Sequence, residues 1–308
     1  MTTSAIILNY NGKEVIGECI ESLLKQSTMP DEVIVVDNGS IDNSIEIVKQ
    51  FPQVKLIELK ENVGVGAGYN AGIKASKGEN LLLLNNDVTL DKYCVENLVE
   101  YRKLGHNIGM VQPKIMYADT PSVINSLGLW INREGFAGNI SDGKIDGLFE
   151  NKFIFGCGGG AFMYTREALK SAGLFDASYQ FYFEDVDISW RIQQCGFSCL
   201  LVPSALVYHK CGYSTKKLSN YTRDYYSHRN RITTLAKRLE KDQFVAYLPW
   251  LVLSELKIIG LSLVSRRWGM LKGNIAGLLN ARNARRNREV LTCRTVDWRI
   301  IDKWFKGE

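Results

Sequence analysis

The 308-residue sequence lacks the features that mark several specialised classes of protein. No basic stretch followed by an apolar one comes after Met1, so we expect no secretory signal. The seven cysteines are odd in number, scattered and without a CxxC pair. They argue against a zinc site or a disulfide framework and favour the reduced thiols of a cytosolic protein. Even without disulfides or a structural metal ion, a chain of this length and ordinary globular composition can bury a full core.

Charge is unevenly distributed along the chain. Residues 1–209 hold 17 basic and 25 acidic side chains, a net charge of −8, whereas residues 210–308 hold 21 and 8, a net charge of +13. A basic region of this size favours an anionic partner, either a lipid surface or nucleic acid. The sequence therefore indicates an acidic front part and a basic back part with different physical roles.

The front part alternates strand and helix patterns. Short apolar runs at 4–8, 32–36, 54–59 and 81–84 are separated by stretches with helical spacing. Such an order predicts an α/β fold with a mostly parallel sheet covered on both faces. Further on, we expect hairpins and loops over 109–160, short helices at 166–172 and 185–194, and strands at 198–202 and 205–208.

From about residue 221 the pattern is helical and basic, with a strongly apolar run at 244–264. That run contains Pro249, Glu255 and Lys257, and each charge near the centre of a bilayer would cost about 2.5–3.5 kcal/mol. We therefore expect an interfacial helix pair on an anionic membrane, with the arginines of 282–288 against the headgroups, and no nucleic acid. The alternative is a helical subdomain packed on the core, with a solvated basic surface.

Polar groups follow three of the expected strands, where ligands of an open α/β sheet collect. These groups are Asn9-Tyr10-Asn11, Asp37 and Asn85-Asn86-Asp87. Asp37 could accept hydrogen bonds from a base or a ribose, or could cap a turn. In the glycine-rich stretch 62–72, only a weak dinucleotide fingerprint, we favour a ligand role for Asn62 and Asn70, with close helix packing as the alternative for the glycines.

Two positions suggest a metal site. Asp87 at a strand end suits a Mg²⁺ or Mn²⁺ ion that neutralises a diphosphate, although it could instead begin a helix. His209 also follows a strand, and a lone histidine is more often structural than a ligand. A metal role for both residues is our expectation.

Three acids, Glu184, Asp185 and Asp187, lie beside an aromatic run. Carboxylates next to apolar surface are costly unless they have a partner or a function, and one of these could take a proton from an attacking hydroxyl. Acids that complement a helix dipole are the alternative.

Taken together, the motifs resemble those of family 2 glycosyltransferases, and within that family the rhamnosyltransferase-type enzymes. In chain order they are Asn9-Tyr10-Asn11, Val36-Asp37-Asn38-Gly39-Ser40, Asn62-x-Gly64, Asn70, Asn85-x-Asp87, Gly158-Gly159-Gly160-Ala161, Phe183-Glu184-Asp185-x-Asp187 and Trp190-Arg191. The resemblance covers roughly residues 3–215 and the later pair Arg229-Asn230.

The resemblance implies a GT-A fold, with a catalytic domain at 1–215 and a basic, membrane-associating helical region at 216–308. It assigns Asp37 to the nucleoside, Asp87 and His209 to a divalent metal, and Asp185, next to Glu184, to the catalytic base. The residues it places around a nucleotide-diphosphate sugar are Asn9, Tyr10, Asn11, Asp37, Asn62, Asn70, Asn86 and Gly159.

Two positions depart from the family pattern. The usual Asp-x-Asp reads Asn85-Asn86-Asp87, so one metal carboxylate is an amide. Tyr69 stands where an arginine often precedes Asn70, so a basic contact to the donor is missing or comes from elsewhere.

The activity implied is an inverting transfer in a single displacement, at the inner face of the cell membrane. The donor expected from the branch is dTDP-rhamnose, with UDP-sugars next, and the acceptor a glycan or a polyprenyl-linked sugar. Two alternatives are a sugar-phosphate nucleotidyltransferase and a non-catalytic, membrane-associated carbohydrate-binding protein. The first usually has a glycine-rich loop with a basic residue after its first strand, where this chain has Asn-Tyr-Asn-Gly.

Overall fold

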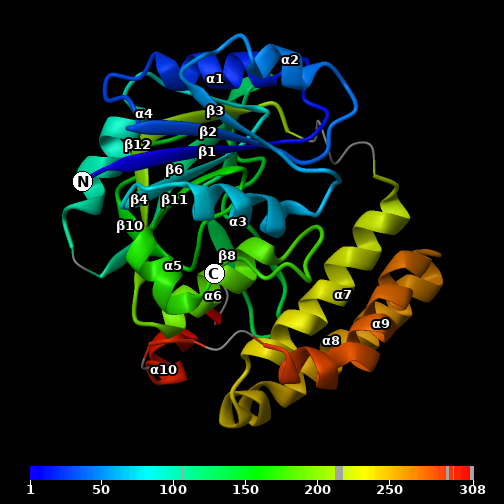
Figure 1. Ribbon diagram of the computed structural model, residues 1–308. Coiled ribbons are helices and arrows are strands. Elements are labelled where there is room, and N and C mark those ends of the chain that lie inside the picture. Colours follow the sequence, from blue (N-terminus) through cyan, green and yellow to red (C-terminus); the bar gives the residue numbers. More distant parts are fainter. Residues whose placement is uncertain (106, 212–217, 289–290, 294, 306–308) are drawn as a thin grey trace.

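The computed structural model describes residues 1–308 except 106, 212–217, 289–290, 294 and 306–308. Within these residues one large sheet is covered by helices on both faces, and a group of longer helices stands beside it (Figure 1). Its strands are β1 (Thr3–Asn9), β2 (Glu32–Asp37), β3 (Val54–Glu58), β4 (Asn80–Asn85), β5 (Val88–Leu90), β6 (Ile108–Tyr117), β7 (Thr120–Ser126), β10 (Lys152–Ile154), β11 (Ala161–Thr165) and β12 (Ser198–His209). A separate hairpin pairs β8 (Leu129–Ile131) with β9 (Ala137–Asn139).

Strand order along the main path is β10-β12-β6-β11-β4-β1-β2-β3. The half formed by β4, β1, β2 and β3 is parallel throughout, and β11 runs antiparallel to both of its neighbours. All seven residues of β1 are buried, because both faces of the sheet are covered. The parallel order brings the ends of β1, β2 and β4 to one edge.

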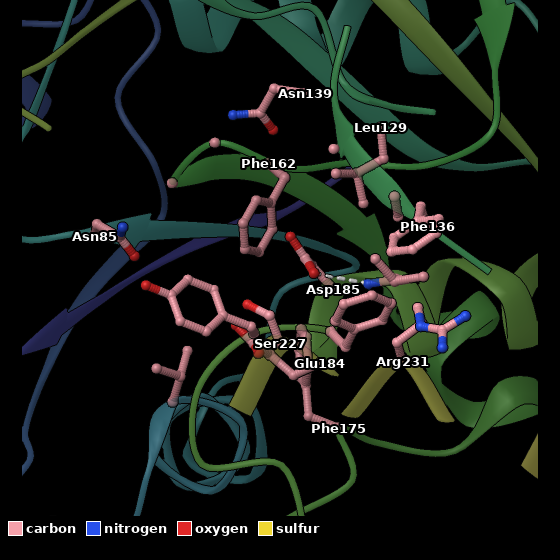
Figure 2. Close-up of a pocket in the computed structure, with 18 of the residues that line it drawn as sticks. Asn85, Leu129, Phe136, Asn139, Phe162, Phe175, Glu184, Asp185, Ser227 and Arg231 are labelled. Atoms are coloured by element: carbon pink, nitrogen blue, oxygen red, sulfur yellow. Dashed lines mark hydrogen bonds between the residues drawn. The ribbon is translucent and has the colours of Figure 1, made fainter. Parts of the chain in front are cut away.

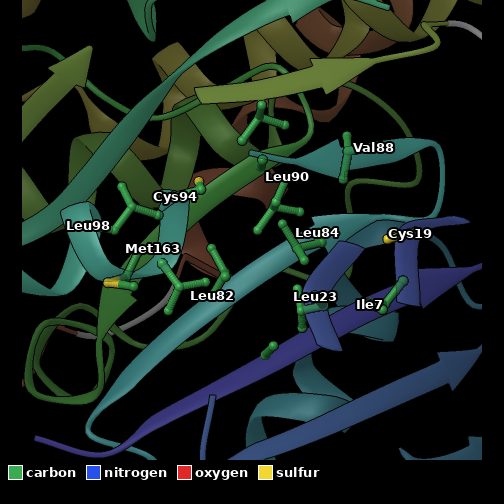
Figure 3. Close-up of a cluster of buried hydrophobic side chains, with 14 of the residues drawn as sticks. Ile7, Cys19, Leu23, Leu82, Leu84, Val88, Leu90, Cys94, Leu98 and Met163 are labelled. Atoms are coloured by element: carbon green, nitrogen blue, oxygen red, sulfur yellow. The ribbon is translucent and has the colours of Figure 1, made fainter. Parts of the chain in front are cut away.

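The shorter helices are α1 (Ile16–Leu24), α2 (Ser44–Val48), α3 (Val65–Ala75), α4 (Cys94–Arg102), α5 (Arg166–Ala172) and α6 (Glu184–Gln194). One core contains buried side chains of α1, α2 and α4, and a second core contains those of α3, α5 and α6. Figure 3 shows part of the first core, where Leu23 of α1 and Leu98 of α4 lie around Leu82 and Leu84 of β4.

The expected α/β alternation is therefore confirmed, with one difference. The two strands expected at 198–202 and 205–208 form the single strand β12, whose register against β6 shifts between Val202 and Leu206. A β-bulge keeps both stretches in one ladder, so the polar interruption in the sequence does not end the strand. His209 is consequently the last residue of β12.

The helical region contains α7 (Asn220–Arg238), α8 (Lys241–Val264) and α9 (Trp268–Arg286). Glycines allow α9 to lie directly on α7: a Cβ at Gly269 would stand 2.4 Å from the Tyr221 carbonyl oxygen, and one at Gly273 2.4 Å from that of Tyr225. The two positions advance together, so α7 and α9 run in the same direction. The expected domain boundary between residues 215 and 216 falls outside the described residues.

Helix α8 is continuous through Pro249, and among the described residues it is the one helix that has the length and the apolar composition needed to cross a membrane. Most of its large apolar side chains are exposed, Leu256 and Val264 among them. Its inner face, with buried Tyr247, Leu251 and Ile258, packs toward the rest of the protein.

The short elements α10 (Trp298–Ile301) and η2 (Asp302–Phe305) return to the half that contains the large sheet. Phe305 packs on Trp190 of α6, with ring centroids 4.7 Å apart, in a third core that also holds Leu235 of α7 and Tyr247 of α8. The end of the described chain therefore joins the helical region to α6.

The expectation that all cysteines are reduced thiols is wrong, because Cys195 and Cys293 form a disulfide. Folding brings their Cα atoms to 5.6 Å, within the range a disulfide spans, although 98 positions separate them in the sequence. The other cysteines, Cys19, Cys94, Cys157, Cys199 and Cys211, are free.

Candidate active site

A pocket of about 410 Å³ opens between the sheet, the hairpin β8–β9 and helices α3, α6 and α7. Figure 2 shows side chains around it from the sheet, the hairpin, α6 and α7, among them Asn85, Asn139, Asp185 and Arg231. Of the residues predicted from the sequence, those on its wall are Gly159, Glu184, Asp185 and His209. It therefore unites the expected base, one expected metal ligand and the glycine turn.

Glu184 and Asp185 enter the pocket from the first turn of α6. The two residues before them, Tyr182 and Phe183, have φ values of 64° and 72°, a left-handed conformation that is rare for bulky side chains. The turn is held by Asn230 of α7, whose side-chain nitrogen donates to the carbonyls of Phe181 at 2.7 Å and Tyr182 at 2.9 Å. This backbone conformation sets the direction in which α6 begins.

Burial gives the two carboxyl groups different proton affinities. Burial, together with the charge of Asp185, raises the pKa of Glu184 to about 8, and one of the Glu184 oxygens is buried without a hydrogen-bond partner in the described part of the chain. Burial also raises the pKa of Asp185, to about 6. The Val186 backbone N–H, which donates to Asp185 at 2.8 Å, has the opposite, smaller effect and lowers this pKa. At neutral pH the pair therefore holds one proton on Glu184 and one charge on Asp185, which is the member able to accept a proton.

The third acid of the cluster has a different surrounding. Asp187 is fully buried and accepts hydrogen bonds from Arg191 at 2.9 Å and from Arg238 at 2.6 Å. Both of its carboxylate oxygens are thus occupied by guanidinium groups. Asp187 joins α6 to α7 and does not line the pocket.

His209 and Asp87 form a pair at one side of the pocket, with the His209 Nε2 atom 3.1 Å from the Asp87 Oδ1 atom. Burial would lower the pKa of His209, but its hydrogen bonds to Asp87 and Cys211 raise it to about 9. Gly160 keeps this side open, because a Cβ there would meet Asn85 at 2.8 Å and His209 at 3.2 Å. The 3.1 Å distance is that of a direct hydrogen bond, and it is close to the roughly 3.0 Å between two ligands of an octahedral ion with bonds of about 2.1 Å, so a divalent cation held by this pair would replace the hydrogen bond. Among the described residues no group of three or more His, Cys, Asp or Glu side chains is arranged to hold a metal ion.

The strand-end residues Asn9, Asp37 and Asn86 form a buried network that does not reach the pocket wall. The Asn9 amide nitrogen donates to Asp37 at 2.8 Å, and its oxygen accepts from Asn86 at 2.8 Å. The second Asp37 oxygen accepts from the Ser40 backbone N–H at 2.9 Å. The network ties together the ends of β1, β2 and β4, and the nucleoside role of Asp37 stays a prediction.

The other residues expected to bind the nucleotide sugar form hydrogen bonds with the backbone. Asn70 donates to the Phe175 carbonyl at 2.7 Å and accepts from the Phe175 N–H at 3.0 Å, so both ends of its amide are used. Asn62 accepts from the Gly64 N–H, and Asn11 from the Ile41 N–H. Tyr10 is 37% exposed at the same edge of the sheet. These residues shape the loops after the strands, and their contact with a donor also stays a prediction.

Several polar residues of the wall were not predicted. They are Tyr69, Asn139, Ser227, His228 and Arg231, whereas Asn85 is one of the strand-end residues that the sequence did single out. Tyr69, which stands where the family often has an arginine, is a buried residue of the wall. Its hydroxyl donates to Asn85 at 3.0 Å. Ser227, His228 and Arg231 lie on one face of α7, and their helical spacing is a pattern that could have been found in the sequence. Arg231 brings a guanidinium group to the pocket.

Comparison with known proteins agrees with this geometry. Residues 4–173 match the model of the family described as glycosyl transferase family 2. Poly-beta-1,6-N-acetyl-D-glucosamine synthase of Staphylococcus epidermidis is 25% identical over 218 residues, which are 66% of this chain and 48% of that protein. The chain thus spans about half the length of the curated relatives it matches first.

Two solved structures show the same fold. GalNAc-T7 with UDP, GalNAc and Mn²⁺ superposes with a TM-score of 0.66 at 18% identity, over 94% of this chain and 55% of that one. A mannosyltransferase from Pyrobaculum calidifontis in complex with GDP-Man and Mn²⁺ superposes with a TM-score of 0.56 at 17% identity, over 91% and 86% of the two chains. The GT-A architecture expected from the sequence is confirmed.

Proposed function

Because the chain belongs to glycosyl transferase family 2, we propose that it transfers a sugar from a nucleotide-diphosphate donor to a hydroxyl of a glycan or lipid-linked acceptor. The observation that carries this proposal is one pocket whose wall holds Glu184, Asp185 and His209, with the buried Asp87 hydrogen-bonded to His209 from outside the wall. An acid–base group and a site for a diphosphate are the two requirements of such a transfer.

In the proposed reaction the acceptor oxygen attacks the anomeric carbon from the face opposite the diphosphate. The carbon–oxygen bond to the diphosphate breaks, and the acceptor proton passes to the Asp185 carboxylate. The result is inversion in one displacement. Glu184, protonated at neutral pH by its raised pKa, leaves the negative charge on Asp185. No covalent sugar–enzyme intermediate is needed.

A divalent cation, Mg²⁺ or Mn²⁺, would be held by Asp87 and His209 and would supply positive charge to the departing diphosphate. The 3.1 Å separation of the two ligand atoms supports this assignment, as does the Mn²⁺ in the two similar structures. Replacement of the other usual carboxylate by Asn85 leaves one acidic ligand, so the diphosphate itself would complete the site.

For the donor we propose dTDP-rhamnose or a UDP-sugar. The first rests on the motif resemblance, and the second gains support from the UDP in GalNAc-T7. Asp37 and the 9–11 loop would hold the nucleoside after a local rearrangement of the Asn9–Asp37 hydrogen bond. Arg231 is the candidate for the basic contact that Tyr69 does not provide.

We further propose that α8 and α9 dock the enzyme on the cytosolic face of an anionic membrane. Many large apolar side chains on their surface are exposed, with Leu253 at 55% and Leu279 at 82%. Their inner faces pack on α7, which also lines the pocket, and Glu255 of α8 pairs with Arg231. An α8 helix inserted across the bilayer would pull this packed face away from the pocket, so an interfacial position is favoured.

Incubation with a panel of nucleotide sugars tests the proposed reaction. We expect release of a nucleoside diphosphate from one donor, stimulated by Mg²⁺ or Mn²⁺ and by a lipid-linked acceptor. Release of pyrophosphate from a nucleoside triphosphate and a sugar phosphate would instead identify a nucleotidyltransferase. Failure to turn over any donor, with binding of glycan alone, would favour the carbohydrate-binding alternative.

A further inference from the structure

Helices α7, α8 and α9 enclose an apolar groove of about 640 Å³, separate from the catalytic pocket. Its walls include Leu235 of α7 and Leu239 just after that helix, Phe244, Leu248 and Leu251 of α8, and Leu278 of α9. This volume lies within the range of roughly 300–1,000 Å³ typical of small-molecule sites. The groove is therefore large enough for a hydrocarbon ligand.

A second hollow of about 450 Å³ adjoins one end of the groove and is basic. The two hollows share Glu240, Lys241 and Arg285, and the second also contains Arg288. Arg285 is oriented by the carbonyls of Ala236 and Leu239, to which it donates at 3.1 and 2.8 Å. Within the described residues Lys241 and Arg288 form no ion pair, so their charges are available to an anion.

The other two cations of the basic hollow are already neutralised. Lys237 pairs with Asp176, and Arg238 pairs with Asp187. The available positive charge therefore lies at Lys241 and Arg285, which both hollows share together with the acid Glu240, and at Arg288, which lines the basic hollow alone. An amphiphile with a phosphate head and an apolar tail matches this order of surfaces.

We infer that this continuous site binds a phosphate-bearing lipid with one long hydrocarbon chain. The chain lies in the groove between α7, α8 and α9, and the phosphate contacts Lys241, Arg285 and Arg288. The occupant is the lipid carrier of the acceptor, a statement that rests on the proposed glycosyl transfer.

The position of α7 connects the two sites. Its residues Ser227, His228 and Arg231 line the catalytic pocket, and the next turns, from Ile232 onward, line the groove. From Arg231 to Arg238 the helix rises about 10 Å. Figure 1 shows α7 running from the catalytic half to the end where α8 begins. The basic hollow, which Lys237 and Arg238 line, therefore lies beyond the groove as seen from the catalytic pocket, and a glycan on the bound phosphate has to span at least this rise to bring its end to that pocket.

A direct binding measurement tests the inference. Farnesyl phosphate is titrated into the detergent-free protein and followed by calorimetry, with farnesol, inorganic phosphate and vesicles of a two-chain anionic phospholipid as separate arms. We expect farnesyl phosphate to bind and farnesol to bind about tenfold more weakly, because farnesol lacks the charge-assisted hydrogen bonds of the phosphate. We expect inorganic phosphate not to bind, because it lacks the hydrocarbon chain that the groove holds.

Two variants and two matched controls locate the site. Ala281→Trp fills the groove, and Lys241→Gln combined with Arg288→Gln removes the free charges; each should weaken farnesyl phosphate binding about tenfold. Ala246→Trp on the exposed side of α8, and Lys257→Gln combined with Arg266→Gln, should leave binding unchanged. Thermal unfolding midpoints close to that of the parent protein verify that the variants fold.

Three outcomes would overturn the inference: equal loss in the control variants, equal affinity for farnesol, or unchanged binding of farnesyl phosphate in the two site variants. Donor hydrolysis without an acceptor separates the two proposals. If hydrolysis proceeds and farnesyl phosphate does not bind, the lipid site is wrong. If farnesyl phosphate binds and no donor is turned over, the proposed transfer is wrong and the lipid site stands.

Discussion

His209 and Asp87 are 122 positions apart in the sequence, and their Nε2 and Oδ1 atoms are 3.1 Å apart in the structure. The pair follows from the pairing of β12 with β5, which sets His209 opposite Val88, the residue after Asp87. Sheet register, and not a local motif, thus builds the proposed cation site.

Asp87→Ala should weaken the metal-dependent binding of the nucleoside diphosphate, by at least the roughly 10- to 100-fold that the loss of a supporting group around a metal ligand causes. The proposed site has a single carboxylate, so no neighbouring acid replaces it. Titration of UDP or dTDP with and without Mn²⁺ measures the effect, with Asp91→Ala, beyond β5, as the control. Parent protein that binds the nucleotide equally well without metal would refute the metal role.

Asp185→Asn should reduce transfer roughly 100- to 10,000-fold while donor binding stays nearly intact, because an amide keeps the shape but cannot accept the proton. Single-turnover transfer together with donor binding separates the two effects. Glu184→Gln is the matched comparison and should be milder, since Glu184 is protonated at neutral pH. If Asp185→Asn keeps turnover within a few-fold, Glu184 becomes the candidate base, because both oxygens of Asp187 are bound by arginines.

Activity should fall as the pH drops through about 6, the raised pKa of Asp185, because the base is active only when it is deprotonated. The profile of kcat/KM between pH 5 and 8, at saturating metal, measures this midpoint. Glu184→Gln should keep the inflection near 6 and remove any second one near 8. A profile flat across this range would contradict the assignment of Asp185.

Asp187→Ala should destabilise the fold by about 3–5 kcal/mol, because it leaves Arg191 and Arg238 buried without their carboxylate. Urea unfolding measures the loss. Glu21→Ala, which removes an exposed pair with Lys25, is the control and should leave the midpoint unchanged. Equal stability of the Asp187 variant would show that the buried network does not hold α6 to α7.

Anionic vesicles should capture the protein by flotation at low salt and release it as salt rises, because attraction between exposed charges is screened within a Debye length. Replacement of Arg282, Arg285, Arg286 and Arg288 by Gln should reduce capture, and neutral vesicles serve as the control. A protein that stays free of anionic vesicles at low ionic strength, and is monodisperse without detergent, would favour a packed helical subdomain.

The sequence predicted the sheet well because its strands are buried on both faces and read as uninterrupted apolar runs, as in Leu81–Leu84 of β4. It also located the acid cluster. Only the family resemblance separated Asp185 from Asp187, because the physical difference between them is Arg238, 51 positions away, which reaches only Asp187. Both residues are aspartates, so the residue type gave no information about which of them pairs with Arg238.

The strand-end rule predicted that the polar residues after β1, β2 and β4 meet at one edge of the sheet, as they do, but not which of them are buried there. Asn9 and Asp37 were expected to face a ligand, and they instead hydrogen-bond each other across neighbouring strands. Conversely, Arg231 reaches the pocket because α7 packs against α6, a tertiary contact that leaves no mark in the strand pattern. Pairing between distant elements accounts for both differences.

The disulfide between Cys195 and Cys293 has a consequence for covalent topology. It closes a ring of the chain that contains α7, α8 and α9 and leaves the parallel half of the sheet outside it. Hydrolysis of one peptide bond within this ring divides the backbone but not the molecule. A protease cut between the helices would therefore give two bands on a gel only after reduction, and the nicked enzyme would keep α6 and the segment after α9 covalently joined.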